Sequence, residues 1–150
     1  MKTFLRAIAV SAVCGLGAVV QAVNFRTVVI DSGHGGQDNG GQWGKVYEKH
    51  LALDTATRLE ANLKRMGYQT VMTRRSDYFV SLPQRVAIGN SYRSAIFVSV
   101  HYNQTWKENV SGLETFYYSL EGQKLAQCVQ DSLLRHTNTV DRQAKFARFM

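Results

Sequence analysis

The chain has 150 residues, two cysteines and a formal net charge of +7, so a single domain is expected. Its basic residues are scattered, and no run of like charges is long enough to form an arm that binds nucleic acid. We therefore expect no nucleic-acid partner. If the protein is exported, a mildly basic surface suits an anionic cell-wall polymer or an anionic membrane face.

Residues 1–22 have the pattern of a secretory signal peptide. Lys2 and Arg6 form a basic start, residues 7–20 are uncharged and mostly apolar, and Ala22 ends a small-x-small cleavage signal. The apolar stretch is shorter than the roughly 20 residues that a membrane-spanning helix needs. The sequence thus predicts export with cleavage after Ala22 and no stable membrane insertion afterwards.

Two alternatives to cleavage are weaker. A lipoprotein would use Cys14, but Val13 precedes it where a small residue is expected. Membrane retention through an uncleaved segment ranks third. In the favoured interpretation, residues 23–150 form the mature domain, and Cys128 is its remaining cysteine. Its stability must then come from packing, and from a metal if one binds, because no disulfide can form within the chain.

Along the first half of the mature domain, the spacing of apolar residues indicates a strand, then a loop and then a helix. Residues 26–30 are rich in β-branched side chains and predict a buried strand. Residues 31–44 include six glycines and predict a loop. An amphipathic helix should follow, because apolar residues recur at steps of four and three. These residues are Ala52, Ala56, Leu59, Leu63 and Met66. Gly67 comes directly after the helix as the expected C′ residue.

The second half of the mature domain continues the alternation of strands and helices. It predicts a strand at residues 68–73, a helix at 81–92, strands at 95–100 and 112–118, a helix at 122–135, and the start of a further element at 146–149. Ser81 should cap the second helix, with Gln84 as its partner in a capping box. Apolar strands that alternate with amphipathic helices indicate an α/β fold with a mostly parallel central sheet flanked by helices.

The last predicted helix carries Leu125, Val129 and Leu133 on one face, which is expected to pack on the sheet. Cys128 lies beside this stripe, and we expect it in the core. His136 closes the same helix, where a histidine suits the helix dipole, so its predicted role is structural.

Two histidines stand just beyond predicted strands. His34 follows the first strand, His101 follows the strand at residues 95–100, and Glu48 opens the helix between them. Ligands in parallel α/β sheets bind outside the carboxyl ends of the strands, so both histidines should reach the same edge. A His2Glu set leaves a fourth tetrahedral position free, as in catalytic zinc sites. The sequence therefore predicts a zinc site for metal-assisted hydrolysis.

Neighbouring residues have more than one interpretation. Asp31 could support the ligands as an outer carboxylate or hold the loop backbone, and Asn103 could face the same cleft or end the strand in a turn. His50 lies two residues after Glu48, so on a helix it points away from that side chain, and we expect it on the surface.

The succession of motifs resembles the zinc-dependent N-acetylmuramoyl-L-alanine amidases of bacterial peptidoglycan. The matching blocks are Val28-Val29-Ile30-Asp31-Ser32-Gly33-His34-Gly35-Gly36, Tyr47-Glu48-Lys49, Thr73-Arg74, Leu82-x-x-Arg85 with Asn90, Ile96-Phe97-Val98-Ser99-Val100-His101-Tyr102-Asn103, and Gly112-Leu113-Glu114-Thr115-Phe116-Tyr117. The resemblance implies zinc bound by His34, Glu48 and His101. It also implies an α/β fold and cleavage of the bond between N-acetylmuramic acid and L-alanine.

Two departures from the family pattern matter. Ser32 stands where the family usually has proline, which removes a rigid backbone angle but no ligand. The family also has a catalytic glutamate in a last strand that is expected beyond Met150, so the predicted domain is incomplete at its C-terminus. Glu114 is the weak internal candidate for that role, and an ordinary strand residue is the favoured interpretation of it.

Three functions remain open at this point: a periplasmic or cell-wall amidase, a zinc or cell-wall binding module with impaired catalysis, and a zinc peptidase acting on the stem peptide. The loops between the matching blocks are short and hold no obvious helix to plug the cleft. This pattern favours control by a protein activator or by access to substrate.

Overall fold

A computed structural model describes residues 25–105, 107 and 110–148, so the predicted signal peptide lies outside the described residues. Its elements are, in chain order, β1 (Thr27–Ser32), β2 (Gln42–Trp43), β3 (Val46–Tyr47), α1 (Glu48–Arg65), β4 (Gln69–Met72), α2 (Leu82–Asn90), β5 (Ala95–Val100), β6 (Leu113–Tyr117), α3 (Leu120–His136) and β7 (Asp141–Phe146). The described part has no helix that is both long and apolar enough to cross a membrane.

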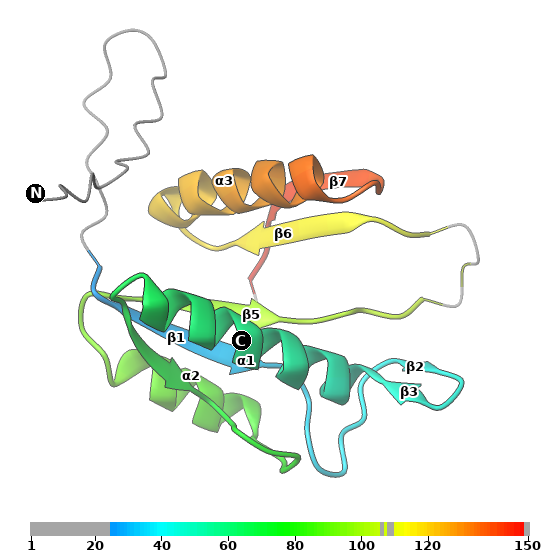
Figure 1. Cartoon of the computed structure of the whole chain (residues 1–150), viewed down its shortest axis with the longest axis horizontal. Coiled ribbons are helices and arrows are strands. Elements are labelled where there is room, and N and C mark those ends of the chain that lie inside the picture. Colours follow the sequence, from blue (N-terminus) through cyan, green and yellow to red (C-terminus); the bar gives the residue numbers. More distant parts are fainter. Residues whose placement is uncertain (1–24, 106, 108–109, 149–150) are drawn as a thin grey trace, which may run out of the picture.

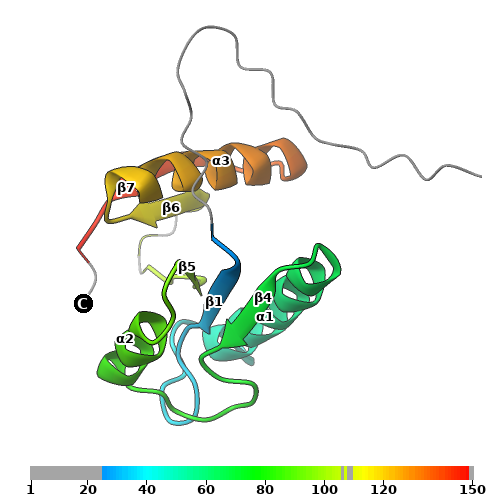
Figure 2. The same cartoon turned by 90° about the vertical axis from the view of Figure 1, so that its left-hand side faces the viewer.

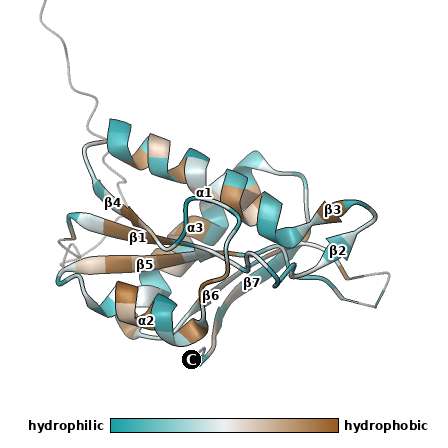
Figure 3. Cartoon of the chain, turned by 90° about the horizontal axis from the view of Figure 1, so that it is seen from below, coloured by the Kyte–Doolittle hydropathy of each residue, from teal (hydrophilic) through white to brown (hydrophobic). Residues whose placement is uncertain are grey.

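The central sheet is parallel and has the order β4-β1-β5. Every residue of β1 is buried, because this strand lies between two others and its faces are covered. Figure 3 shows the apolar colouring of β1 between its two neighbours. This arrangement confirms the predicted α/β fold with a parallel sheet.

The two crossover helices lie on different sides of this sheet. The chain moves from β1 to β4 through α1 and then passes back over β1 to β5 through α2. Because parallel crossovers are right-handed, crossovers in opposite directions place their helices on opposite faces. Figure 2 shows α1 and α2 separated in this way. The sheet is thereby covered by helices, which leaves its carboxyl edge for a site.

The main core lies between β1 and α1. Val28, Ile30 and Ala56 form its buried centre, and the predicted helix residues Leu59 and Leu63 pack against it. The predicted capping box at the start of α2 is also confirmed. Ser81 N–H donates to Gln84 Oε1 at 2.9 Å, and Gln84 N–H donates to Ser81 Oγ at 3.4 Å.

A second, smaller layer consists of β6 and β7, which pair in parallel, with α3 packed along them (Figure 1). Strand β7 corrects the prediction of an element beginning at residue 146, since the strand ends there instead. Its sequence, Asp-Arg-Gln-Ala-Lys-Phe, has no apolar run, so no periodic pattern reveals it.

The buried face of α3 differs from the predicted one. Ala126 and Gln130 are buried, whereas Val129 and Leu133 are exposed. Cys128 is also exposed, so the expectation that it lies in the core was wrong. Gln130 holds the inner position because its amide donates to Leu113 O on β6 and to Asp141 Oδ1 on β7. Hydrogen bonding selects the face of this helix that points inward.

Candidate metal centre

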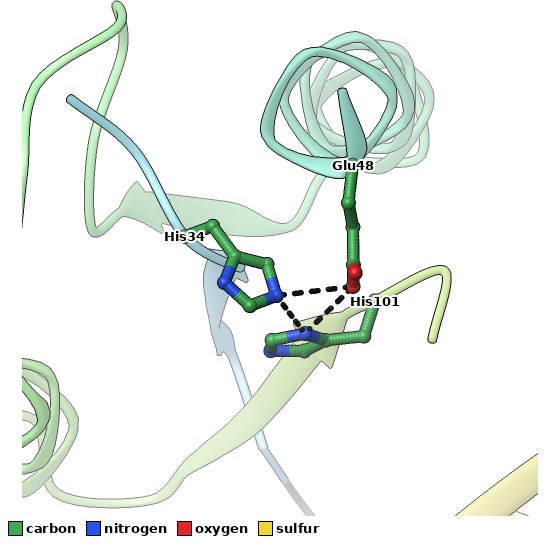
Figure 4. A group of neighbouring side chains, drawn as sticks. All are labelled: His34, Glu48 and His101. Carbon is green, nitrogen blue, oxygen red and sulfur yellow. Dashed lines mark hydrogen bonds and ion pairs between the residues drawn. The ribbon is translucent and has the colours of Figure 1, made fainter. Parts of the chain in front are cut away.

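The three predicted ligands meet at the carboxyl edge of the central sheet. His34 follows β1, His101 follows β5, and Glu48 is the first residue of α1. His34 Nε2, His101 Nδ1 and Glu48 Oε1 form a triangle, and each pair of atoms is 3.1 Å apart. Figure 4 shows Glu48 extending from α1 toward both imidazoles. The structure thus brings together the whole predicted ligand set.

This triangle fits a tetrahedral metal ion. Zinc binds imidazole nitrogen and carboxylate oxygen at about 2.0–2.1 Å, so two of its ligands lie about 3.3 Å apart. The observed separations of 3.1 Å are close to that value. The Glu48 side chain is 2% exposed, while those of His34 and His101 are 21% and 39% exposed. The site is therefore closed on the side of α1 and accessible beside His101.

Glu48 is held by backbone donors on both oxygens. Gly41 N–H donates to Oε2 and Tyr102 N–H donates to Oε1, each at 2.8 Å. Burial raises the pKa of Glu48, but these two donors and the neighbouring imidazoles outweigh it, and the pKa is lowered overall. The carboxylate is consequently charged and fixed in place, as a metal ligand must be.

Asp38 orients His34, and the sequence interpretation missed this residue. His34 Nδ1 donates to Asp38 Oδ2 at 2.9 Å, while Asp38 Oδ1 accepts from Gly40 N–H at 3.0 Å. Because a carboxylate is an acceptor, Nδ1 carries a proton, and Nε2 is the nitrogen that faces the triangle. The carboxylate four residues after His34, within the glycine loop, was the available signal.

The glycines of the loop make room for the two rings. A Cβ atom on Gly33 would lie 2.4 Å from His101 Cε1, and one on Gly40 would lie 2.5 Å from His34 Cδ2. His34 itself has a φ of 59°, a left-handed conformation that is costly for a residue with a side chain. The loop therefore needs glycines beside the ligands and other contacts to hold His34 in this conformation.

Asp31 contacts the ligands only through intermediaries. Its Oδ1 accepts from Thr73 Oγ1 at 2.7 Å and from Arg85 Nη1 at 2.6 Å, and its Oδ2 accepts from Ser99 Oγ at 2.6 Å. Arg85 in turn donates to His34 O. These contacts favour the role of holding the loop backbone.

The remaining candidates lie outside the triangle. Asn103 is exposed, and its role stays a prediction. Glu114 accepts from Lys145 Nζ at 2.8 Å and from Arg142 Nε at 3.1 Å, and these cations lower its pKa despite partial burial. A carboxylate with a lowered pKa is a weaker base, which makes a catalytic role for Glu114 less attractive.

Two other histidines behave as predicted. His50 is exposed on α1, and its ring lies at 81° to that of Tyr47 rather than in the triangle. His136 ends α3, where its Nδ1 lies 2.8 Å from Ser132 O. Neither residue belongs to the ligand set.

Comparison with known proteins places this architecture in a family. Residues 28–150 match the sequence model of the N-acetylmuramoyl-L-alanine amidase family. The germination-specific N-acetylmuramoyl-L-alanine amidase of Bacillus subtilis is 32% identical over 136 residues, which cover 80% of this chain and 57% of that protein.

Solved structures of other proteins support the same family assignment. The amidase AmiC2 of Nostoc punctiforme is 39% identical with a TM-score of 0.77, covering 82% of this chain and 69% of that one. The catalytic domain of the amidase CwlV from Bacillus (Paenibacillus) polymyxa var. colistinus is 32% identical with a TM-score of 0.78, covering 83% and 72%. The chain belongs to the N-acetylmuramoyl-L-alanine amidase family.

Proposed function

We propose that this chain hydrolyses the amide bond between N-acetylmuramic acid and L-alanine in peptidoglycan, with one zinc ion held by His34, Glu48 and His101. The observation that carries the proposal is the ligand triangle at the carboxyl edge of the sheet, with equal sides of 3.1 Å. Two imidazoles and one carboxylate match the ligand set of catalytic zinc, which keeps a position for water or substrate. Family membership supplies the substrate class.

Each residue at such a zinc site would have a different role. Zinc, when bound, lowers the pKa of a coordinated water and polarises the amide carbonyl. Glu48 supplies the single negative charge of the ligand set, and its backbone donors keep it ionised. Asp38 keeps the proton of His34 on Nδ1. The exposed side of His101 is where substrate can approach.

Proton transfer to the leaving nitrogen needs a further acid–base group. Such a group contributes roughly 10²–10⁴-fold to the rate. Among the described residues, Glu114 is the candidate for this role, although its contacts with Lys145 and Arg142 lower its pKa and make it a weaker base. We expect the described residues to bind metal and substrate, and the rate of hydrolysis to depend on an acid–base group of this kind.

Identifying which bond of the substrate is cleaved tests this proposal. A soluble N-acetylmuramoyl-peptide should be incubated with the zinc-loaded protein, and the products identified by mass spectrometry. We expect free N-acetylmuramic acid and a peptide with a new N-terminal L-alanine. His34→Ala should abolish this product, while His50→Ala, a change at an exposed position of α1 outside the triangle, should leave it unchanged.

The alternatives give different products. Cleavage inside the stem peptide, with the sugar still attached to alanine, would identify a peptidase and overturn the amidase assignment. Retention of intact substrate by the zinc-loaded protein, without any cleavage, would identify a binding module instead. Cleavage that continues unchanged after removal of all metal by a chelator would contradict the role of zinc.

We also propose that the protein is exported and acts on the cell wall outside the cytoplasmic membrane. The basic start, the apolar stretch and the cleavage signal at Ala22 support export, and peptidoglycan as substrate agrees with it. N-terminal sequencing of the protein recovered from outside the cytoplasm should begin at Val23. A sequence that begins at Met1 or Lys2 in the membrane fraction would contradict cleavage.

A further inference from the structure

We propose that Arg74 is a positioning residue that sets the distance between the metal ligands by binding, with one guanidinium group, the backbone on which they are carried. The inference rests on the proposed function, since it assumes that the ligand triangle binds zinc. Arg74 directly follows Thr73 and β4, and it is the largest fully buried side chain of the described residues, with 0% exposure.

The hydrogen bonds of Arg74 reach segments that are distant in sequence. Its Nη2 donates to Gly33 O and to Lys49 O, each at 2.7 Å, and its Nε donates to Ser32 O at 3.0 Å. Gly33 precedes His34, and Lys49 follows Glu48. A single nitrogen therefore bridges the residues next to two ligands.

The third ligand is connected through Gly33. Gly33 N–H donates to Val100 O at 3.1 Å, and Val100 precedes His101. The space for a Cβ on Gly33 is occupied by the His101 ring. Because Arg74 holds the carbonyl of Gly33, it fixes the peptide segment against which His101 packs. The guanidinium group thus binds the backbone next to His34 and Glu48 directly, and it reaches the backbone next to His101 through Gly33.

Arg85 completes this support from α2. Its Nη2 donates to His34 O at 2.7 Å, and its Nη1 donates to Ser32 O at 2.8 Å. The carbonyls of Ser32, Gly33 and His34 are consequently all bound by buried arginines. These bonds hold His34 in its left-handed conformation, which the glycine-rich loop alone would not enforce.

The planar shape of arginine is what this role requires. Arg74 also donates from Nη1 to Ser76 O at 3.1 Å, so all three of its nitrogens are bonded to carbonyl oxygens. No ion pair involves Arg74 within the described part of the chain. Lysine would keep the positive charge, but its single ammonium group cannot reproduce a rigid fork that spans separated carbonyls. Arg74→Lys therefore keeps the positive charge and removes the hydrogen-bonding geometry of the guanidinium group.

The first test compares zinc affinity in Arg74→Lys and in a control of equal burial. Gln130 is also 0% exposed and bridges α3 to β6 and β7, away from the ligand set. We expect Arg74→Lys to weaken zinc binding by about tenfold or more, as loss of groups that orient ligands typically does. Gln130→Met should destabilise the fold without changing zinc affinity. The parent affinity in a folded Arg74→Lys protein would overturn the proposal.

Cobalt provides a readout of geometry rather than of stability. The visible spectrum of bound Co²⁺ depends on coordination number and symmetry. We expect Gln130→Met to keep the parent spectrum and Arg74→Lys to change it. An unchanged cobalt spectrum in Arg74→Lys would show that Arg74 contributes to stability alone, and would contradict a positioning role.

The unsubstituted protein supplies a test that does not depend on the folding of a variant. Coupling between two sites is reciprocal, so zinc should protect the Arg74 guanidinium protons from exchange with solvent if Arg74 sets the ligand geometry. By NMR, we expect zinc to slow exchange at Arg74 more than at the side-chain amide of Gln130. Equal slowing at both positions would reflect general stabilisation and would overturn the proposal.

A different set of zinc-binding results would show that the proposed function, rather than the role of Arg74, is wrong. If His34→Ala and His101→Ala bind zinc as tightly as the parent, the triangle is not the metal site, whatever Arg74 does. If both substitutions abolish binding while Arg74→Lys has no effect, the metal site stands and the positioning role of Arg74 is rejected.

Discussion

Asp38 Oδ2 and His34 Nδ1 lie 2.9 Å apart, and this contact orients the His34 ring so that its other nitrogen faces His101 and Glu48. With Nδ1 protonated toward Asp38, Nε2 is the nitrogen that lies 3.1 Å from Glu48 Oε1. A histidine ligand whose other nitrogen binds a carboxylate is a more basic and better oriented ligand.

Replacement of Asp38 should therefore weaken the metal site. We expect Asp38→Ala to lower zinc affinity by about 10–100-fold, because His34 loses the acceptor that fixes its tautomer. Competition with a chromophoric chelator measures this change. Asp54→Ala is the matched control, since Asp54 is an exposed aspartate on α1 paired with Arg58. Equal affinities for Asp38→Ala and Asp54→Ala would show that Asp38 does not orient the ligand.

Gly33 offers a steric test of the same site. A methyl group at Gly33 would overlap the His101 ring at 2.4 Å, and the backbone there has no positive φ that would add strain. We expect Gly33→Ala to displace His101 and to lower zinc affinity by at least tenfold while the sheet still forms. Gly122→Ala on α3 is the control, and it should bind zinc as the parent does. Normal binding by Gly33→Ala would contradict the close approach of His101.

Asp31 should matter for stability more than for metal affinity. Its ion pair with Arg85 is buried on both sides, and removing one partner of such a pair typically costs about 3–5 kcal/mol. We expect Asp31→Ala to lower the free energy of unfolding by this order in urea denaturation. The effect on zinc affinity of the folded fraction should be smaller than that of Asp38→Ala. The reverse order would assign Asp31 the direct supporting role that the structure gives to Asp38.

The stability of the fold should depend on pH through Glu60. A bidentate contact with Arg75 lowers its pKa, and although burial opposes this, contacts with Lys64 and Thr70 add to it and bring the pKa to about 2 from 4.5. A lowered carboxyl pKa gives stability that is complete above pH 4.5 and is lost as the pH falls toward 2.

Glu60→Gln should remove that dependence. We expect the parent to lose about 1–2 kcal/mol more than the variant between pH 5 and pH 2, less than the full pKa shift implies, because Arg75 and Lys64 are largely exposed and screened by solvent. Urea denaturation of both metal-free proteins across this range measures the difference. Parallel pH profiles would show that the Glu60 contacts do not stabilise the fold.

The meeting of His34, Glu48 and His101 at one edge of the sheet could be predicted from the sequence, because the ends of the strands determine where these residues lie. His34 and His101 each follow an apolar run, and parallel neighbouring strands carry such residues to one edge. Glu48 joined them because it begins the helix that leaves the same edge. This prediction depends on the spacing of apolar residues and on the order of strands and helices, and both can be read directly from the sequence.

Contacts that depend on loop conformation were not predictable in this way. Asp38 contacts His34 from within the glycine loop, where His34 is left-handed, and no periodic pattern encodes this loop conformation. The inner position of Gln130 was missed because apolar periodicity favoured Val129 and Leu133, whereas hydrogen bonds to β6 and β7 decide the packing. Strand β7 was missed for a related reason, since its pairing with β6 does not require an apolar run.

The central claim is that His34, Glu48 and His101 bind one zinc ion, and X-ray absorption at the zinc edge tests it most directly. The protein loaded with one equivalent of zinc should show nitrogen and oxygen ligands at about 2.0–2.1 Å, including two imidazoles and no sulfur. His34→Ala and His101→Ala should each lose this pattern. A sulfur ligand at about 2.3 Å, which the exposed Cys128 would supply, or an unchanged spectrum in both variants would contradict the claim.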